Sequence, residues 1–284
     1  QARKATEILP VKDFDGHHPP YPVNRRFPDP PPVNTQPKRP AAMIHHPIPK
    51  SIPRRGHVSA WVLAAILPMG SLADNEAPPP LPSCLSSTTG ETTQAALMKI
   101  QPGEEELLAR LTYAEATSTG FADDPRVYGS IAWGVMNRVR LGAVSATARR
   151  QYGSGVAGVI FKPQQFNPAV SRKSPFSRGF LCPRDETRWP LAVHAARQAL
   201  RGQDNPFLHT PWERQQGRSL VVNFYYPRSI QARGPLAPWE DNRALRFIGD
   251  PPLDSPLPPA ERIRFYRLAQ PPGDLVDLPA SSMN

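Results

Sequence analysis

One glutamate of this sequence stands where a charged side chain is not expected. Leu108, Leu111 and Glu115 are spaced at i, i+3 and i+7, so they share the face of a helix that the leucines turn toward the interior. Burial disfavours the ionised form of a carboxyl group, so a buried glutamic acid can stay protonated near neutral pH and donate a proton. On spacing alone, a structural ion pair between Glu115 and Arg138 is the simpler interpretation.

Three helices are predicted to position these side chains. The helix that carries Glu115 is expected over residues 104–117, because three glutamates in its first turn offset the positive end of the helix dipole. Apolar residues at four-residue steps predict a second helix that begins at Pro125 and ends at Gly142. An alanine-rich third helix is expected over residues 190–200, with Gly202 as its stop signal.

Two strands are predicted to follow the helices. Residues 219–226 are rich in β-branched and aromatic types and are closed by Pro227, and residues 263–268 are a second candidate strand. Helices first and a small sheet later are typical of an α+β domain rather than a parallel α/β domain. We therefore expect a mainly helical α+β domain with a small β-sheet in its C-terminal half.

Proline sets the limits of the folded part. Of the 38 prolines, 19 lie before Glu104, and proline lacks a backbone donor and fixes its own φ, so this region is poor material for a core. We expect residues 1–42 to be disordered or a non-native extension, residues 74–102 to be a Pro/Ser/Thr linker and residues 270–284 to be a disordered tail. Residues 103–269 remain as one folded domain of common size.

Residues 43–73 resemble a signal peptide. A basic stretch is followed by the apolar run 58–69 and then by small residues up to Ala73. The apolar run is shorter than the ~20 residues of a membrane-spanning helix. We therefore expect export to the periplasm or cell wall with no stable membrane span, and we expect Met43 to be the true first residue.

Charge and cysteine content narrow the possible partners. The net charge of +10 favours anionic surfaces, such as nucleic acid, lipid headgroups or the acidic polymers of a cell wall. Charge alone does not choose among them, and the arginines also supply solubility. The two cysteines, Cys84 and Cys182, exclude a disulfide scaffold and a four-cysteine zinc site. A single bridge between them is one possibility for an exported chain.

Short segments along the domain resemble one enzyme family. Residues 111–116 (LTYAEA), which contain Glu115, are similar to the Tyr-Ala-Glu-Ala signature of SleB-like cell wall hydrolases, a family that includes spore-cortex-lytic enzymes. Further segments resemble elements of this family in the same order, namely residues 135–139, 159–166, 195–202, 224–227, 238–239 and 265–267. The chain departs from the family at Asn223 and Tyr226, where His and Asn are usual.

The resemblance implies a lysozyme-like fold and cleavage of the β-1,4 bond between N-acetylmuramic acid and N-acetylglucosamine, with Glu115 as the catalytic acid. In a lytic transglycosylase one residue acts first as acid and then as base, so no second carboxylate is needed. We favour this route over a muramidase, which pairs two carboxylates. Asp123 and Asp124 are the nearest further acids, but aspartates just before a helix that begins at Pro125 are typical helix caps. No metal or other cofactor is expected.

Four residues are candidates for the sugar groove, because aromatic faces stack on pyranose rings and an amide can bind hydroxyl and acetamido groups: Gln165, Tyr225, Tyr226 and Trp239. Since strand side chains alternate, one of Tyr225 and Tyr226 is expected to face the core, and Trp239 is equally compatible with core packing. We interpret Asn137 and Arg138 as structural.

Two other functions are compatible with the sequence. A cell wall amidase or peptidase would use zinc or a cysteine nucleophile, for which the domain offers His194, His209 and Cys182, without the spacing of a zinc site. A non-catalytic basic module that binds peptidoglycan or nucleic acid is favoured by the charge and by the arginine-rich residues 138–150. If the protein is such a module, Glu115 is dispensable. If it is the glycosidase, its partner is the peptidoglycan strand and not nucleic acid.

Overall fold

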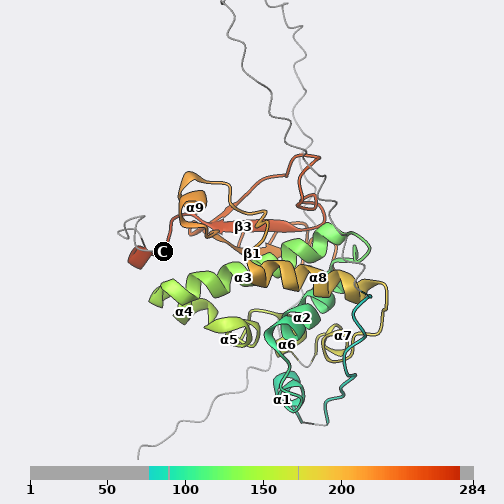
Figure 1. Cartoon of the computed structure of the whole chain (residues 1–284). Helices are drawn as coiled ribbons and strands as arrows, with labels where there is room; N and C mark the ends of the chain where they lie inside the picture. Colours follow the sequence, from blue (N-terminus) through green and yellow to red (C-terminus); the bar gives the residue numbers. More distant parts are fainter. Residues whose placement is uncertain (1–76, 89, 172, 276–284) are drawn as a thin grey trace, which may run out of the picture. The chain divides into compact units, whose positions relative to one another are not determined.

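Helices and a small sheet pack around helix α3 (Pro125–Val144) in a computed structural model that describes residues 77–88, 90–171 and 173–275 (Figure 1). Helix α3 contacts α2 (Glu104–Thr119), α8 (Arg188–Arg201) and strand β1 (Val221–Tyr225). The architecture is mixed α+β, as predicted. The expected N-terminal extension and signal-peptide-like segment lie outside the described residues. Of the expected disordered tail, residues 270–284, the first part is ordered, because a 3-10 turn forms at Gly273–Leu275 and Leu275 is buried, whereas residues 276–284 lie outside the described residues.

All three predicted helices are present. Helix α2 begins at Glu104, as expected, and ends at Gly120 in the left-handed conformation with φ of 80°. Helix α3 begins at Pro125 with Asp124 as its cap, because the Asp124 side chain accepts a hydrogen bond from the amide of Arg126 at 3.0 Å. Helix α8 ends at Gly202, also left-handed, with φ of 79°.

The predicted end of the second helix at Gly142 is wrong, because α3 continues to Val144. Glycine is needed there for close packing rather than for termination. A Cβ atom on Gly142 would approach the carbonyl oxygen of Gly153 to 2.6 Å. Gly134 acts in the same way against the sheet, because its Cβ would come within 2.6 Å of the Phe224 ring.

The sheet has three antiparallel strands in the order β1-β3-β2, with β3 at Arg264–Leu268 and β2 at Leu245–Phe247. The two predicted strands correspond to β1 and β3, whereas β2, at three residues, was not predicted. Side chains of α3 bind the backbone of β1, since Asn137 Nδ2 donates to the carbonyl of Val221 at 2.9 Å and Arg138 Nε donates to that of Val222. These contacts hold the first residues of β1 against α3.

Several short helices were not predicted, because none exceeds seven residues and so few residues display no clear period. They are α1 (Thr93–Met98), α4 (Ala146–Tyr152), α5 (Gly155–Ile160), α6 (Asn167–Val170), α7 (Ser177–Leu181), α9 (Pro211–Gln216) and the 3-10 turn η1 (Gly273–Leu275).

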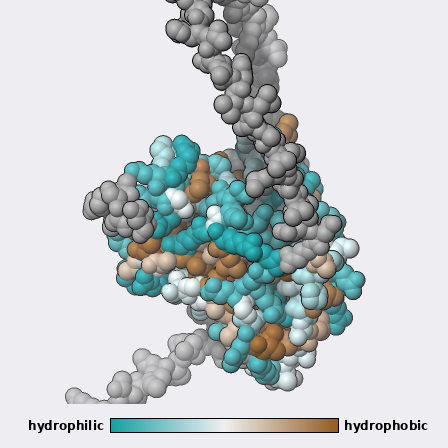
Figure 2. All heavy atoms as spheres, viewed as in Figure 1, coloured by the Kyte–Doolittle hydropathy of each residue, from teal (hydrophilic) through white to brown (hydrophobic). Residues whose placement is uncertain are grey.

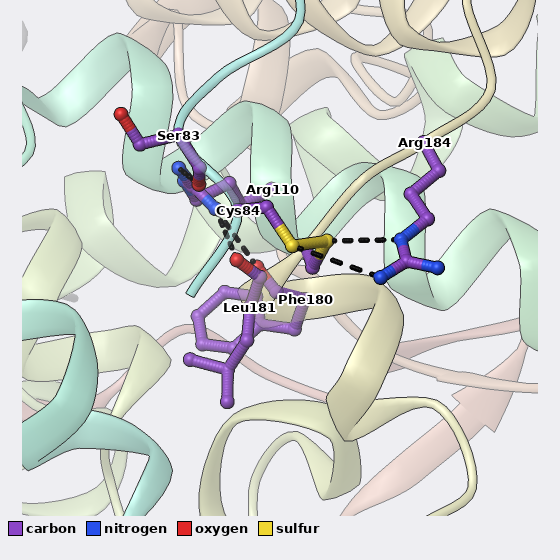
Figure 3. Close-up of a disulfide and its surroundings, with 7 residues drawn as sticks. Ser83, Cys84, Arg110, Phe180, Leu181 and Arg184 are labelled. Atoms are coloured by element: carbon purple, nitrogen blue, oxygen red, sulfur yellow. Dashed lines mark hydrogen bonds between the residues drawn. A yellow bond between two sulfur atoms is a disulfide. The ribbon is translucent and has the colours of Figure 1, made fainter. Parts of the chain in front are cut away.

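The expected linker is ordered where the structure describes it. Its proline-rich part, residues 77–88, has no helix or strand, but Cys84 forms a disulfide with Cys182 (Figure 3). The buried guanidinium of Arg110 donates to the carbonyls of Ser83 and Leu181, both at 2.8 Å. Helix α1 then begins at Thr93, after Thr92, whose hydroxyl accepts a hydrogen bond from the amide of Ala95 at 3.0 Å. Contacts with distant residues, which local composition does not encode, therefore fix this segment against the domain.

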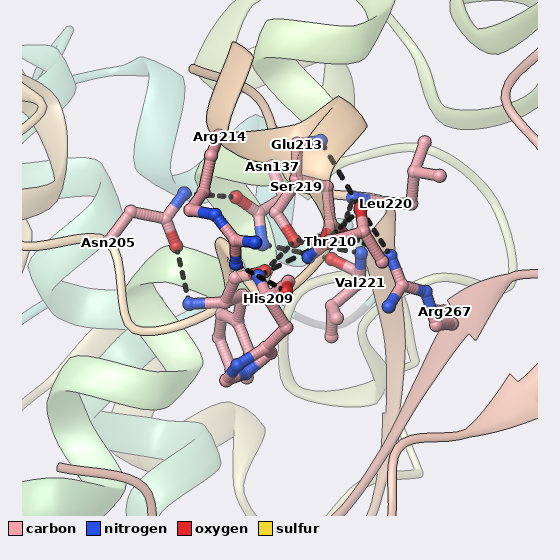
Figure 4. Close-up of polar contacts among 11 residues, drawn as sticks. Asn137, Asn205, His209, Thr210, Glu213, Arg214, Ser219, Leu220, Val221 and Arg267 are labelled. Carbon is pink, nitrogen blue, oxygen red and sulfur yellow. Dashed lines mark hydrogen bonds and ion pairs between the residues drawn. The ribbon is translucent and has the colours of Figure 1, made fainter. Parts of the chain in front are cut away.

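A buried carboxylate stabilises the entry into β1 (Figure 4). Glu213 on α9 is fully buried and forms an ion pair with Arg267 of β3 at 2.8 Å. Its oxygens also accept hydrogen bonds from the backbone amides of Leu220 and Thr210, both at 2.8 Å. Burial raises the pKa of Glu213, but these hydrogen bonds and the charge of Arg267 outweigh burial and hold the pKa below its usual value.

The visible surface is mainly hydrophilic, and its hydrophobic residues occur in small separate groups (Figure 2). Among the described helices, none combines the length and the hydrophobicity that a bilayer-spanning segment needs.

Candidate functional site

All five residues that the sequence nominated line one cavity of about 520 Å³. Glu115 comes from α2, Gln165 from the connection between α5 and α6, Tyr225 and Tyr226 from the end of β1, and Trp239 from the loop that follows. Helix–sheet packing therefore brings together residues that are more than 120 positions apart in the sequence.

Glu115 is the acid of this cavity. Its side chain is only 5% exposed, and of the described aspartates and glutamates it alone lines the cavity. Burial raises the pKa of Glu115 to about 7, although the hydroxyl of Tyr226 and the positive charge of Arg138 both act to lower it. At neutral pH the carboxyl group is therefore divided between its protonated and ionised forms, as a group that both donates and accepts a proton requires.

The expected ion pair between Glu115 and Arg138 is not formed. No salt bridge within 4.0 Å joins Glu115 to a described basic residue, and Arg138 Nη1 instead donates to Gln165 Oε1 at 2.8 Å. The Arg138 guanidinium also lies over the rings of Phe166 and Phe224, 4.7 and 5.5 Å from their centroids. Arg138 thus has the structural contacts that were predicted, and it also supplies positive charge to the cavity.

Three buried polar atoms of the cavity wall have no hydrogen-bond partner among the described residues: Tyr152 Oη, Tyr226 Oη and Trp239 Nε1. The Tyr226 hydroxyl lies close enough to Glu115 to affect its pKa, without a hydrogen bond of normal geometry. Buried polar groups without a partner cost free energy, and these three are concentrated in the lining of one cavity.

Gln165 is oriented by Arg138, which accounts for its position in the wall. The neighbouring Gln164 also lines the cavity and has a positive φ of 65°. Non-glycine residues in this region cost free energy and are concentrated at functional sites. Gln164 was not predicted, although it directly precedes the predicted Gln165.

Tyr225 holds a loop beside the cavity. Its hydroxyl donates to the carbonyl of Gly234 at 2.7 Å and accepts from the amide of Arg233 at 3.1 Å. Its ring meets that of Trp239 edge to face, with 6.1 Å between centroids. The prediction that one of Tyr225 and Tyr226 faces the core holds for Tyr226, which is 9% exposed, although both tyrosines line the cavity.

The two aspartates that were weighed as a second catalytic carboxylate lie elsewhere. Asp124 caps α3 and forms ion pairs with Arg126 and Arg262 at 2.8 and 2.6 Å. Asp123 pairs with Arg188 at 2.9 Å. The interpretation of Asp124 as a cap is confirmed, and neither side chain lines the cavity.

Several cavity residues were not predicted from the sequence, namely Ser118, Gln151, Tyr152, Asn223 and the loop residues Ser229, Gln231, Ala232 and Arg233. Ser118 follows Glu115 by one helical turn, so the helical spacing places it on the same face. Tyr152 lies on a helix that was not predicted, and the loop has no pattern that marks it.

The residues required by the amidase or peptidase alternative are not assembled. Cys182 forms the disulfide with Cys84, so its sulfur is not a free thiol. Across the described residues, no group of three or more His, Cys, Asp or Glu side chains has a geometry that could hold a metal ion. No protein-family model, curated protein or solved structure matches the chain.

Proposed function

We propose that residues 103–269 form a lysozyme-like peptidoglycan glycosidase of the SleB-like kind, which cleaves the bond between N-acetylmuramic acid and N-acetylglucosamine as a lytic transglycosylase. The observation that carries the proposal is the raised pKa of Glu115, a buried carboxyl group in a cavity lined by amide and aromatic side chains. A glycosidic oxygen needs a proton to leave, and a carboxyl group with a pKa near 7 can supply it at physiological pH.

The single carboxylate favours transglycosylation over hydrolysis. Glycosidases that activate water or form a covalent intermediate pair two carboxylates at about 5 to 9.5 Å, and among the described residues Glu115 is the cavity's one acid. In the proposed reaction Glu115 protonates the leaving oxygen as the bond to the anomeric carbon breaks. The resulting carboxylate then takes the proton of the muramic 6-hydroxyl, whose oxygen closes onto the anomeric carbon to give a 1,6-anhydro ring and regenerate the acid.

Other cavity groups have roles that follow from their chemistry. The Arg138 charge stabilises the carboxylate after it has donated its proton, because opposite charges at short range attract strongly in a buried site. The side chains of Gln165, Tyr225 and Trp239 line the cavity, where the rings can stack on pyranose rings and the amide can bind hydroxyl and acetamido groups. Export is supported by the Cys84–Cys182 disulfide, since such bonds persist in oxidising compartments.

Product analysis tests the proposed reaction. Purified protein is incubated with peptidoglycan and the released muropeptides are identified by mass spectrometry. We expect products ending in 1,6-anhydro-muramic acid. Reducing ends would identify a muramidase instead, and released peptides would identify an amidase or peptidase. Binding to peptidoglycan without any product would indicate a non-catalytic binding module.

Activity is expected to fall at alkaline pH. The acid must be protonated in the free enzyme, so kcat/KM should be constant well below pH 7 and fall tenfold per unit above the pKa of Glu115, to about 30-fold below the plateau at pH 8.5. Initial rates on solubilised glycan strands from pH 5 to 9 measure this profile. A rate that stays level up to pH 9 would rule out Glu115 as the titrating acid.

A further inference from the structure

Two neighbouring cavities share wall residues with the cavity of Glu115. One, of about 500 Å³, shares Gln151 and Tyr152 with it, and we call it the arginine cavity because Arg243 and Arg246 line it. The other, of about 810 Å³, shares Ser229 and Ala232. These two neighbouring cavities differ in charge.

The charged side chains that line the arginine cavity are those of Arg243 and Arg246. No described aspartate or glutamate lines it, and the guanidinium groups of Arg243 and Arg246 form no hydrogen bond or ion pair with a described residue. Several other arginines of the domain are paired with carboxylates, as Arg126, Arg188 and Arg264 are. Two unpaired guanidinium groups at one cavity present donors that match a carboxylate, which arginine binds through two parallel hydrogen bonds.

The position of Arg246 is unfavourable for the fold alone. It lies directly opposite Arg267 in the pairing of β2 with β3, and like charges in that position destabilise a sheet. Glu213 neutralises Arg267 at 2.8 Å, but Arg246 has no such partner. An arginine that faces another arginine across a sheet, without an acidic partner of its own, is expected where an anionic ligand supplies the missing negative charge.

The other neighbouring cavity lacks this character. It is lined by Asp250 and Glu261 as well as by arginines, and its Arg264 is paired with Glu240 at 2.8 Å. A polymer with an anionic substituent would therefore be bound in one direction, with that substituent at the arginine cavity.

We propose that the arginine cavity binds the free carboxylates of the peptide attached to muramic acid, and so makes the enzyme selective for peptide-bearing glycan. The inference rests on the proposed glycosidase function and deepens it. The muramic residue lies beside Glu115, its peptide leaves the sugar past Gln151 and Tyr152, and Arg243 and Arg246 bind the carboxylates.

The test compares two substrates and two double variants. The substrates are glycan strands with intact peptides and the same strands after the peptides have been removed enzymatically. Arg243→Gln with Arg246→Gln is expected to lower kcat/KM on peptide-bearing strands about tenfold and to leave the peptide-free rate within twofold. The control, Arg178→Gln with Arg201→Gln, removes the same charge from exposed sites that line none of the three cavities and should leave both rates unchanged. An equal loss on both substrates, or no loss, overturns the proposal.

Binding separates this proposal from the proposed function. The dissociation constants of a disaccharide-peptide and of the bare disaccharide are measured by calorimetry with the wild-type protein and both double variants. The peptide-bearing ligand should bind about tenfold more tightly, and only the Arg243/Arg246 variant should lose that preference. If the preference is present but no strand is cleaved, the proposed reaction fails and the binding site stands. Equal affinities, or displacement of the disaccharide-peptide by an oligonucleotide that depends on Arg243 and Arg246, would refute the peptide site.

Discussion

Replacing Glu115 with glutamine is expected to abolish cleavage of peptidoglycan, with a loss of at least about 1000-fold in kcat. Glutamine preserves the size of the side chain but neither donates a proton to the leaving oxygen nor accepts one from the muramic 6-hydroxyl. The rate is measured by release of soluble muropeptides. The matched control is Glu104→Gln on the same helix, where the side chain is exposed and lies outside the cavity; it should retain full activity.

Stability measurements on the same variant distinguish a catalytic from a structural glutamate. Because burial raises the pKa of Glu115 from 4.5 to about 7, the ionised group destabilises the folded state above pH 7, by about 3 kcal/mol. The penalty is absent below the unfolded pKa, grows as pH rises from the unfolded to the folded pKa, and is complete above the folded one. We therefore expect Glu115→Gln to be at least as stable as the parent at pH 8, and its advantage to vanish at pH 4. A large loss of stability at both pH values would indicate that Glu115 supports the fold instead.

The second large effect is expected at Glu213, which we interpret as structural. Glu213→Gln should lower the free energy of unfolding by about 3 to 5 kcal/mol, because it leaves Arg267 without its partner in a buried site. For a domain of this size that loss lowers Tm by about 10 °C. Glutamine also places an NH2 group against one of the two backbone amides, of Leu220 or Thr210, that donate to separate carboxylate oxygens in the parent.

Two further measurements fix the cause of that loss. Glu186→Gln, at an exposed position, should change stability by less than about 0.5 kcal/mol. Combining Glu213→Gln with Arg267→Gln should cost less than the sum of the single changes, because no uncompensated cation remains. Since the pKa of Glu213 is held below its usual value, its contribution is complete at neutral pH and is lost as pH falls through that lowered pKa. Additive single and double effects would contradict the assigned ion pair.

The two glutamates show how one residue type serves opposite purposes in this domain. Glu213 is surrounded by donors and a cation, so its charge is stabilised and its pKa falls. Glu115 is also buried but makes no ion pair, so its pKa rises. Hydrogen-bond donors and a cation, which oppose the effect of burial, separate the structural carboxylate from the candidate proton donor.

The sequence by itself determined the elements whose limits are set by neighbouring residues. The glutamates after Gly103, the proline at 125 and the glycine at 202 located the limits of helices, because capping and dipole effects act within one turn. The leucine spacing identified Glu115 as a buried acid. The apparent stop at Gly142 misled, because a glycine required by close packing looks the same in a sequence as one that ends a helix.

Only the tertiary structure decided which side chains meet. That Arg138 binds Gln165 rather than Glu115, that Tyr152 joins the cavity wall and that Cys84 lies beside Cys182 all depend on segments that approach from distant parts of the chain. The pKa of Glu115 also depends on the tertiary structure, because the ion pair with Arg138 that the spacing suggested is not formed. Local patterns encode local free energies, whereas the environment of a buried charge is set by everything that packs around it.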